Sequence, residues 1–449
     1  MRTVKPGECI ERAPYLPEAD WERYRLRVPT DRYYDPAYHE RERRLLWMRI
    51  WQVAGREDEL SQAGDWKTYQ IFDQSFVIVR GSDAKLRGFA NACRHRGNAF
   101  CAAAKGHASR FTCPYHNWSY GLDGRLLAVP RPDFEGSLEE FVGAKEELSL
   151  LEVPVECFAG FIFLNPDPTA PPLAEFLGEM ADVLAPYHIE EMVPVGLNVR
   201  EAIDCNWKVV TDAFQEGYHI QGTHPELIGS VDLAKERCAF FGDHAVATVP
   251  FGGPQLAGLG FAEEAEAIRS LPPANFPGLA AVLPRFEELI DGRHGGASAR
   301  ALLQQATRDT LTGKGLDVSD LTDAQMSDYF FCMLFPNVFL QVLAGEATVI
   351  IAAPHPNGDP NKCIWHVAVY LWLPPEQHAA QRAELIEITP GDHFPYFLAL
   401  EQDFDQMQRQ QTGLRNRALR YMTLTKQELR VVHYHAALDS WIEGGATPA

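Results

Sequence analysis

Two mixed pairs of cysteine and histidine constrain this chain more than any other feature. The segment CRHRGNAFCAAAKGHASRFTCPYH places Cys93 and His95 in one pair and Cys113 and His116 in the other. Thiolates and imidazoles are common protein ligands of zinc and of iron–sulfur clusters. The spacing therefore predicts a metal centre held between two loops of one domain.

Zinc and an iron–sulfur cluster are the two candidate centres for these four side chains. Zinc sites usually combine like pairs, such as C-x-x-C, whereas each pair here joins one cysteine to one histidine. Mixed pairs favour a two-iron, two-sulfide cluster in which one iron takes the thiolates and the other takes the imidazoles. A zinc-stabilised binding protein remains the alternative, and a colourless preparation would indicate it.

The spacing C-x-H-x17-C-x-x-H resembles the Rieske cluster motif, and the flanking Arg96, Gly97 and CPYH segments strengthen the resemblance. It implies that Cys93 and Cys113 bind one iron, with His95 and His116 on the other. Asn98 and Tyr115 stand where high-potential Rieske proteins carry an extra disulfide, so the resemblance implies the lower-potential type found in oxygenases. One departure is Asn117, where many relatives have glycine.

Composition limits the class of protein. The chain has 449 residues, 46% of them hydrophobic, and a formal net charge of -20, which disfavours binding to nucleic acid. We find no apolar run near the roughly 20 residues that span a bilayer and no secretory signal at the start. Nine scattered cysteines suit a reducing compartment. We therefore expect a cytoplasmic globular protein with no membrane partner.

The first part of the chain predicts a small β domain. Residues 38–57 have the periodicity of a helix that leads into a strand. From 65 to 165, short runs of β-favouring residues alternate with turns, and the Cys/His motif lies on loops among them.

The later part predicts a mixture of helices and strands. A helix is expected over 207–220, an irregular Gly-, Pro- and Ala-rich excursion over 250–300, and a capping box at Thr322 and Gln325 that begins a helix. Strands are expected after these segments, followed by a helical C-terminus from about residue 376.

A second candidate metal site lies in NWKVVTDAFQEGYHIQGTHPEL. His219 and His224 are five residues apart, and five residues of an ideal helix turn by ~140°, so the helix must end or bulge between them if both bind one metal. Gly222 and Pro225 are expected to supply that break. Two imidazoles and one carboxylate bound on one face would leave ferrous iron open to oxygen and substrate.

Together the two motifs resemble the α (terminal oxygenase) subunit of Rieske non-heme iron oxygenases of the aromatic-ring-hydroxylating type. In that family N-W-K leads into a carboxylate-x-x-H-x4-H motif, matched here by Glu216, His219 and His224. The family's third ligand is an aspartate in a D-x4-E/Q-x2-Q-x-G pattern, matched by Asp403, Gln408, Gln411 and Gly413. Asp403 is preferred over Asp405, which would face elsewhere on a helix.

The resemblance also implies a fold class and domain bounds. The class is α+β, with a small all-β Rieske domain inserted into a larger catalytic domain whose antiparallel sheet is surrounded by helices. The expected bounds are 1–39 for an N-terminal helical part of the catalytic domain, 40–165 for the Rieske domain, and 166–449 for the catalytic non-heme iron domain.

The implied partners follow from the same family. A separate reductase, with or without a ferredoxin, would pass electrons from NAD(P)H, because this chain has no G-x-G-x-x-G motif opening a helix. Glu216 would link His219 to His116 of the partner subunit, which implies a homotrimer. A separate β subunit remains open. Arg94, Arg96, Lys105 and Arg110 could form a landing patch for the donor.

The implied activity is O2-dependent hydroxylation of a small substrate. An aromatic or other apolar substrate is the first expectation, and the sequence leaves cis-dihydroxylation and monohydroxylation both open. O- or N-demethylation is the alternative at the same iron. A Rieske protein that only transfers electrons is a further alternative, and it would contain no mononuclear iron.

Overall fold

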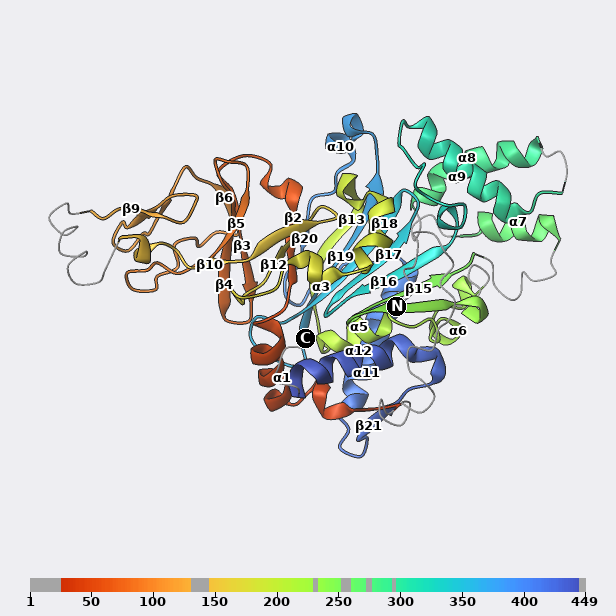
Figure 1. Ribbon diagram of the computed structural model, residues 1–449. Coiled ribbons are helices and arrows are strands. Elements are labelled where there is room, and N and C mark those ends of the chain that lie inside the picture. The colour runs from red at the N-terminus through yellow and green to blue at the C-terminus, as the bar shows by residue number, and fades with distance from the viewer. Residues whose placement is uncertain are drawn as a thin grey trace. The chain divides into compact units, whose positions relative to one another are not determined.

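The computed structural model describes residues 26–130, 145–228, 233–251, 260–271, 277–292 and 296–443 (Figure 1). The chain divides into two compact units. The smaller unit comprises residues 41–176 with 356–358, and the larger comprises residues 1–40, 177–355 and 359–449. One unit is therefore inserted into the other. This confirms the expected α+β class with a small β unit inside a larger mixed one.

The smaller unit is built from short antiparallel strands. They form sheets in the orders β10-β5-β4-β3-β6, β11-β12-β2 and β7-β8-β9. Their bounds are β2 (Gln52–Arg56), β3 (Asp65–Ile71), β4 (Gln74–Arg80), β5 (Leu86–Ala90), β6 (Lys105–His107), β7 (Phe111–Thr112), β8 (Ser119–Tyr120), β9 (Leu126–Ala128), β10 (Glu152–Val153), β11 (Val155–Phe158) and β12 (Phe161–Leu164).

The core of the smaller unit reaches the metal-binding loops. Val77 and Val79 of β4 lie in one buried cluster with Phe111 and Tyr120 of β7 and β8. Cys93 and Cys113 belong to the same cluster. Apolar packing beneath the loops therefore fixes the two thiols, and the predicted placement of the motif among short strands is confirmed.

The larger unit contains one sheet of eight strands in the order β14-β15-β16-β17-β18-β19-β13-β20. Neighbours are antiparallel except the β13–β20 pair, which is parallel. The strands are β13 (Met192–Ile203), β14 (Arg237–Phe241), β15 (His244–Val249), β16 (Tyr329–Leu334), β17 (Val338–Leu343), β18 (Glu346–Pro354), β19 (Cys363–Trp372) and β20 (Ile386–Glu387). A separate two-stranded sheet pairs β1 (Arg27–Pro29) with β21 (Tyr421–Thr423).

The central strands are apolar along most of their length because both faces are buried. β15 is buried at all of its positions, and β18 at most of them. The segment FFCMLFPNVFL spans β16, a turn at Pro336 and β17. Thr322 and Gln325 exchange the predicted capping bonds, but they enclose only a 3-10 turn over Ala324–Met326. The helix expected there is therefore wrong.

Helices pack on this sheet and on one another. α5 contacts β18 and β19, α11 contacts α5 and α6, and α8 and α9 pack together (Figure 1). The α-helices are α1 (Pro36–Glu42), α3 (Leu173–Leu177), α4 (Met180–Leu184), α5 (Trp207–Ala213), α6 (Ile220–Thr223), α7 (Phe261–Arg269), α8 (Pro277–Asp291), α9 (Ala299–Gly313), α10 (Pro375–Gln381), α11 (Leu398–Leu414) and α12 (Leu429–Glu443).

The expected irregular excursion over 250–300 is corrected by the structure. Its described residues form α7, α8 and the start of α9, while 252–259, 272–276 and 293–295 lie outside the described residues. These helices bury Ile268, Phe286 and Leu302 in a common cluster. An apolar stripe at helical spacing therefore outweighed the Gly and Pro content.

The N-terminal part is described only from residue 26, so most of the helical part expected over 1–39 lies outside the described residues. Within the described residues it begins with strand β1 and a 3-10 turn, Thr30–Tyr33, before α1. Across the described ranges, every helix falls short of the length and apolar character that a bilayer crossing requires.

Candidate functional site

Two loops of the smaller unit present the Cys/His motif with matching backbone geometry. In each loop the cysteine N–H donates to the carbonyl five residues on, and the N–H four residues on donates to the cysteine carbonyl. The bonds are Cys93 to Asn98 (2.9 Å) and Gly97 to Cys93 (2.8 Å), then Cys113 to Trp118 and Asn117 to Cys113 (both 2.9 Å). The two loops therefore hold their ligands as equivalent halves of one site.

The departure at Asn117 has a conformational explanation. Gly97 in the first loop has φ 73°, and Asn117 at the equivalent place in the second has φ 58°. Both lie in the left-handed region, which glycine adopts freely and asparagine tolerates better than other side chains. Asn117 therefore fulfils the backbone role of glycine in its loop.

The side chains of the two loops suit a two-iron cluster. Cys93 and Cys113 are buried, His95 is exposed, and the His95 and His116 ring centroids are 4.4 Å apart. His95 stacks on Trp118 with a centroid distance of 4.9 Å. Thiols on the inside with imidazoles together near the surface are the arrangement that an unequally ligated pair of irons needs.

Electrostatics at the buried Cys113 favours the thiolate. Burial would raise the pKa of Cys113, but hydrogen bonds from the backbone N–H groups of Tyr115 and His116, and from Cys93 and Asn98, lower it below its ordinary value. The Tyr120 hydroxyl lies 3.2 Å from Sγ of Cys93. These hydrogen bonds thus stabilise the Cys113 sulfur as the thiolate, the form that binds metal.

The second site lies where helical structure is interrupted after α5. Asn206 caps α5 because its side chain accepts from the Lys208 N–H. The helix ends at Ala213, well before the predicted end near residue 220, and α6 is a single turn that starts after His219 and ends before His224. Helical structure therefore ends before His219 as well as between the two histidines, and Gly222 lies within α6 rather than ending it.

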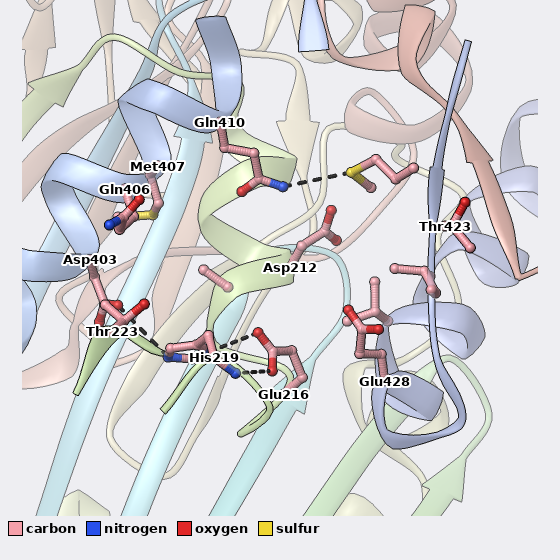
Figure 2. Close-up of a pocket in the computed structure, with 14 residues that line it drawn as sticks. Asp212, Glu216, His219, Thr223, Asp403, Gln406, Met407, Gln410, Thr423 and Glu428 are labelled. Carbon is pink, nitrogen blue, oxygen red and sulfur yellow. Dashed lines mark hydrogen bonds and ion pairs between the residues drawn. The ribbon is translucent and has the colours of Figure 1, made fainter. Parts of the chain in front are cut away.

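The two histidines and Asp403 of α11 come together at this break. One ligand atom from each lies within 4.8 Å of the others. Nε2 of His224 is 2.9 Å, and Nε2 of His219 is 3.8 Å, from Oδ1 of Asp403. Figure 2 shows Asp403 and His219 facing each other, with Glu216 on the other side of the imidazole. Three candidate ligand atoms thus converge on one point. This is the geometry that facial coordination of a metal by two histidines and one carboxylate requires.

Hydrogen-bond partners at Nδ1, the ring nitrogen that points away from the candidate metal position, fix the orientation of both imidazoles. Nδ1 of His219 is 2.7 Å from Oε1 of Glu216, and Nδ1 of His224 is 2.7 Å from Oε1 of Gln402. A partner that accepts a hydrogen bond from Nδ1–H keeps the proton on Nδ1, so the lone pair of Nε2 is free to bind a metal. Gln402 precedes Asp403 in sequence, and sequence reasoning missed its role because no motif position marks it.

Carboxylates shape the protonation of these histidines. Burial by itself would lower the pKa of His219, but the hydrogen bond and charge of Glu216 and the charge of Asp403 raise it above its ordinary value. The pKa of His224 is likewise raised, since Asp403 and Gln402 outweigh the opposing effect of burial.

The expected choice between two aspartates is resolved in space. Asp403 is 6% exposed and faces the histidines, whereas the side chain of Asp405 is exposed and pairs with Arg409 at 3.4 Å. Gln411 accepts from the Asn206 N–H at 3.0 Å, which ties α11 to the start of α5. The motif glutamine therefore ties α11, which carries Asp403, to the start of the segment that leads to the two histidines.

Two cavities meet at the histidine–aspartate cluster. One, of about 310 Å³, is lined by Asp212, Glu216 and Glu428 together with His219 and Asp403 (Figure 2). The other, of about 140 Å³, is lined mainly by apolar side chains, and it also contains Glu236 and Arg430. Phe331 and Phe339, from segment 330–340, form part of the apolar wall of this cavity.

The two sites define a metalloprotein of the Rieske type with a separate mononuclear metal site. The chain belongs to the family of ring hydroxylating alpha subunits, whose catalytic-domain model matches residues 183–444. A Rieske [2Fe-2S] domain model matches residues 50–141. The cofactors of the chain are accordingly a Rieske [2Fe-2S] cluster and a mononuclear iron that works with O2.

Curated relatives of the chain cover two kinds of oxygenase. The glycine betaine monooxygenase oxygenase subunit of Chromohalobacter salexigens is 36% identical over 208 residues, 45% of this chain and 44% of that protein. The biphenyl 2,3-dioxygenase subunit alpha of Rhodococcus jostii is 35% identical over 206 residues, 44% of this chain and 43% of that protein. The match therefore spans less than half the length of these relatives.

Solved structures show the same fold. A quaternary ammonium Rieske monooxygenase in complex with L-carnitine has a TM-score of 0.63 at 20% identity, covering 96% of this chain and 99% of that one. Naphthalene 1,2-dioxygenase from Rhodococcus sp. bound to indole has a TM-score of 0.62 at 19% identity, covering 94% and 96%.

Proposed function

We propose that this chain is the terminal oxygenase component of a multicomponent system that hydroxylates a small organic substrate with O2. The observation that carries this proposal is the convergence of two imidazoles and one carboxylate at an apolar cavity, with ligand atoms within 4.8 Å of one another. A protein that only transfers electrons would not need this second group of candidate metal ligands. The relatives named as monooxygenases and dioxygenases support the same conclusion.

The residues that would hold the metals follow from the geometry. Cys93 and Cys113 would bind one iron of the cluster, His95 and His116 the other, and His219, His224 and Asp403 the mononuclear iron. When bound, these centres supply a one-electron relay and O2 activation.

Surrounding side chains would prepare the mononuclear site. Glu216 and Gln402 hold the outer nitrogens of the imidazoles, so the inner nitrogens stay directed at one point. The apolar lining excludes water from the reacting end of the cavity. In monooxygenation the second oxygen atom leaves as water, and in cis-dihydroxylation both atoms enter the product.

Electrons would come from a separate reductase, directly or through a ferredoxin, with NAD(P)H as the source. Arg94, Arg96, Lys105 and Arg110 are exposed on and near the cluster loops and could attract an acidic donor. Under this proposal, Arg110→Glu should raise the apparent KM for the donor and leave peroxide-driven turnover unchanged.

The active assembly would be a cyclic trimer. Glu216 already accepts from His219 within one chain, and its carboxylate also lines the larger cavity. We propose that it links His219 to His116 of the partner subunit, so that each cluster serves a neighbouring iron. Sedimentation of a fully active monomer would refute the trimer.

Two kinds of substrate and reaction are candidates. An aromatic or apolar substrate fits the wall of Phe214, Phe331 and Phe339. O- or N-demethylation is the second candidate, because relatives named as glycine betaine and carnitine monooxygenases lie beside the dioxygenases. Turnover under 18O2 separates them, since a cis-diol contains both labelled atoms whereas demethylation releases formaldehyde.

Iron counting tests the proposal as a whole. A cluster and a mononuclear ion give about three irons per chain, whereas an electron carrier has about two and a zinc protein has none. Iron and zinc analysis of the purified protein, together with O2 uptake on chemical reduction, decides among these. Two irons with no O2 uptake would overturn the oxygenase.

A further inference from the structure

Arg430 places a buried positive charge at the smaller cavity. It is the second residue of α12 and is 3% exposed. It lines the same cavity as His219, His224 and Asp403. No motif pointed to it, because it lies far along the chain from both histidines. The fold alone brings this guanidinium to the mononuclear site.

The guanidinium is only partly used by the protein. Nη1 donates to the carbonyl of Phe331 at 3.4 Å, and Nη2 contacts Oε1 of Glu236 at 3.5 Å. Both distances lie at the long end for hydrogen bonds. A guanidinium has five N–H donors, so within the described ranges three find no protein acceptor. Burying a charge with so few strong bonds is unfavourable unless another group completes them.

The rest of the cavity suits the remainder of an organic acid. The ring centroids of Phe331 and Phe339 are 5.9 Å apart, and those of Phe214 and Phe339 are 5.4 Å apart. Gln341 and Thr348, which pair in register across β17 and β18, also line the cavity. An aromatic wall, a few polar groups and one buried cation lie around a volume of about 140 Å³. A compact molecule with an apolar body and one anionic end matches this lining.

We propose that the substrate carries a carboxylate and that Arg430 binds it, while the carbon to be hydroxylated lies toward His219, His224 and Asp403. This inference rests on the proposed oxygenase function and names its substrate class. Arg430 would be a binding residue, and its planar fork suits the two oxygens of a carboxylate.

Glu236 would be the ion-pair partner of Arg430 when no substrate is bound. Without substrate it balances the charge of Arg430, and the Cys238 thiol also donates to its Oε1 at 3.6 Å. A substrate carboxylate would take the remaining N–H groups and share the guanidinium with Glu236. A neutral analogue could not supply an acceptor of equal strength, so the site would discriminate against amides and hydrocarbons.

Matched pairs of ligands test this proposal on the intact, iron-loaded protein without turnover. Calorimetric titration under anaerobic conditions would compare benzoate with benzamide, 3-phenylpropionate with its amide, and trimethylglycine with its amide. The expected result is tighter binding of the carboxylate in at least one pair, by roughly 10-fold or more, as for hydrogen bonds to a charged group.

Three variants assign the effect to the pair. Because Arg430→Gln alone would leave Glu236 buried without its partner, the double variant Glu236→Gln with Arg430→Gln keeps the cavity neutral. It should lose the preference for the carboxylate, whereas Glu236→Gln alone should keep or increase it. Arg409→Gln, which removes an exposed arginine of α11, serves as the control and should change nothing.

The outcomes separate this inference from the proposed function. If no carboxylate binds, if amides bind equally well, or if the double variant keeps the preference, Arg430 is only structural and the substrate class is wrong. Iron content and O2 uptake on chemical reduction do not depend on Arg430. Two irons per chain would instead overturn the oxygenase itself, whichever ligand binds.

Discussion

Nε2 of His224 lies 2.9 Å from Oδ1 of Asp403, although 179 positions separate the two residues in sequence. The contact joins the turn after α6 to the first half of α11. A histidine and an aspartate at this distance, both buried, form two sides of a candidate metal site whose third side is His219.

Removing this carboxylate should release the mononuclear iron alone. We expect Asp403→Ala to lower the iron content from about three to about two per chain and to abolish product formation. The visible absorbance of the cluster should stay, because its ligands lie in the other unit. Asp405→Ala is the matched control, since that side chain is exposed on the same helix. Equal iron loss in both variants would contradict the assignment.

Gln402 should position His224 rather than bind metal. Gln402→Leu removes the acceptor that lies 2.7 Å from Nδ1 of His224. Loss of such a partner typically weakens metal binding by about 10- to 100-fold. Iron affinity measured by competition with a chelator checks this. Gln408→Leu is the control, because among the described residues its amide contacts only the carbonyl of Phe404. Unchanged affinity in Gln402→Leu would show that the bond has no such role.

Glu216 should matter for electron transfer more than for iron binding. Glu216→Gln keeps an oxygen that can accept from His219 but removes the charge, so both metals should stay bound. We expect reoxidation of the reduced cluster during turnover to slow on the order of 10- to 100-fold. Stopped-flow absorbance follows that step. Glu428→Gln, an acid lining the same cavity, should retain the normal rate. Wild-type reoxidation in Glu216→Gln would exclude the bridging role.

The left-handed backbone of Asn117 should make its replacement asymmetric. Asn117→Gly relieves no contact and suits φ 58°, so it should be neutral or slightly stabilising. Asn117→Ala should destabilise the loop by about 1 kcal/mol, because alanine lacks the short polar side chain that lets asparagine tolerate the left-handed region. Thermal loss of the cluster absorbance measures both. Alanine and glycine variants of equal stability would argue against this explanation.

A buried carboxyl in the sheet should give the larger unit a pH-dependent stability. Burial raises the pKa of Glu346 from 4.5 to about 8, partly opposed by the hydrogen bond from the Gly278 N–H. Its Oε1 atom is buried and finds no hydrogen-bond partner within the described ranges. The folded state therefore holds a proton that the unfolded state has lost between these pH values, and stability falls as pH rises from about 4.5 to about 8.

Replacing this residue should remove the decline. Relative to the wild type, Glu346→Gln should gain stability between pH 5 and pH 9, on the order of 4 kcal/mol at most. Urea unfolding at several pH values measures the difference. Glu376→Gln, at an exposed position on α10, should follow the wild type throughout. A constant offset between Glu346→Gln and the wild type would show that the carboxyl does not titrate in this range.

The iron–sulfur ligands could be located from sequence because each ligand pair is local. Cys93 and His95 lie in one turn, and Cys113 and His116 in another, so their spacing already expresses the loop geometry. The role of Asn117 could not be inferred in the same way. Only the backbone of the second loop shows that its φ matches that of Gly97.

The apolar helices were harder to predict. Composition over 250–300 favoured an irregular segment, yet Ile268, Phe286 and Leu302 pack together as faces of α7, α8 and α9. Burial of these faces against a common core offsets the low helix propensity of the Gly and Pro residues. This burial depends on the residues that the helices pack against, so it cannot be read from the segment alone.

The sequence by itself indicated the chemistry of both candidate metal sites, since the types of ligand and their short spacings do not depend on the details of the fold. It located His219, His224 and Asp403 through a resemblance. Tertiary structure decided what surrounds them. Gln402, Glu236 and Arg430 belong to the site only because α11, α12 and the sheet pack around one cavity. Contacts between residues distant in the chain leave no local pattern, and they set the charge that a substrate meets.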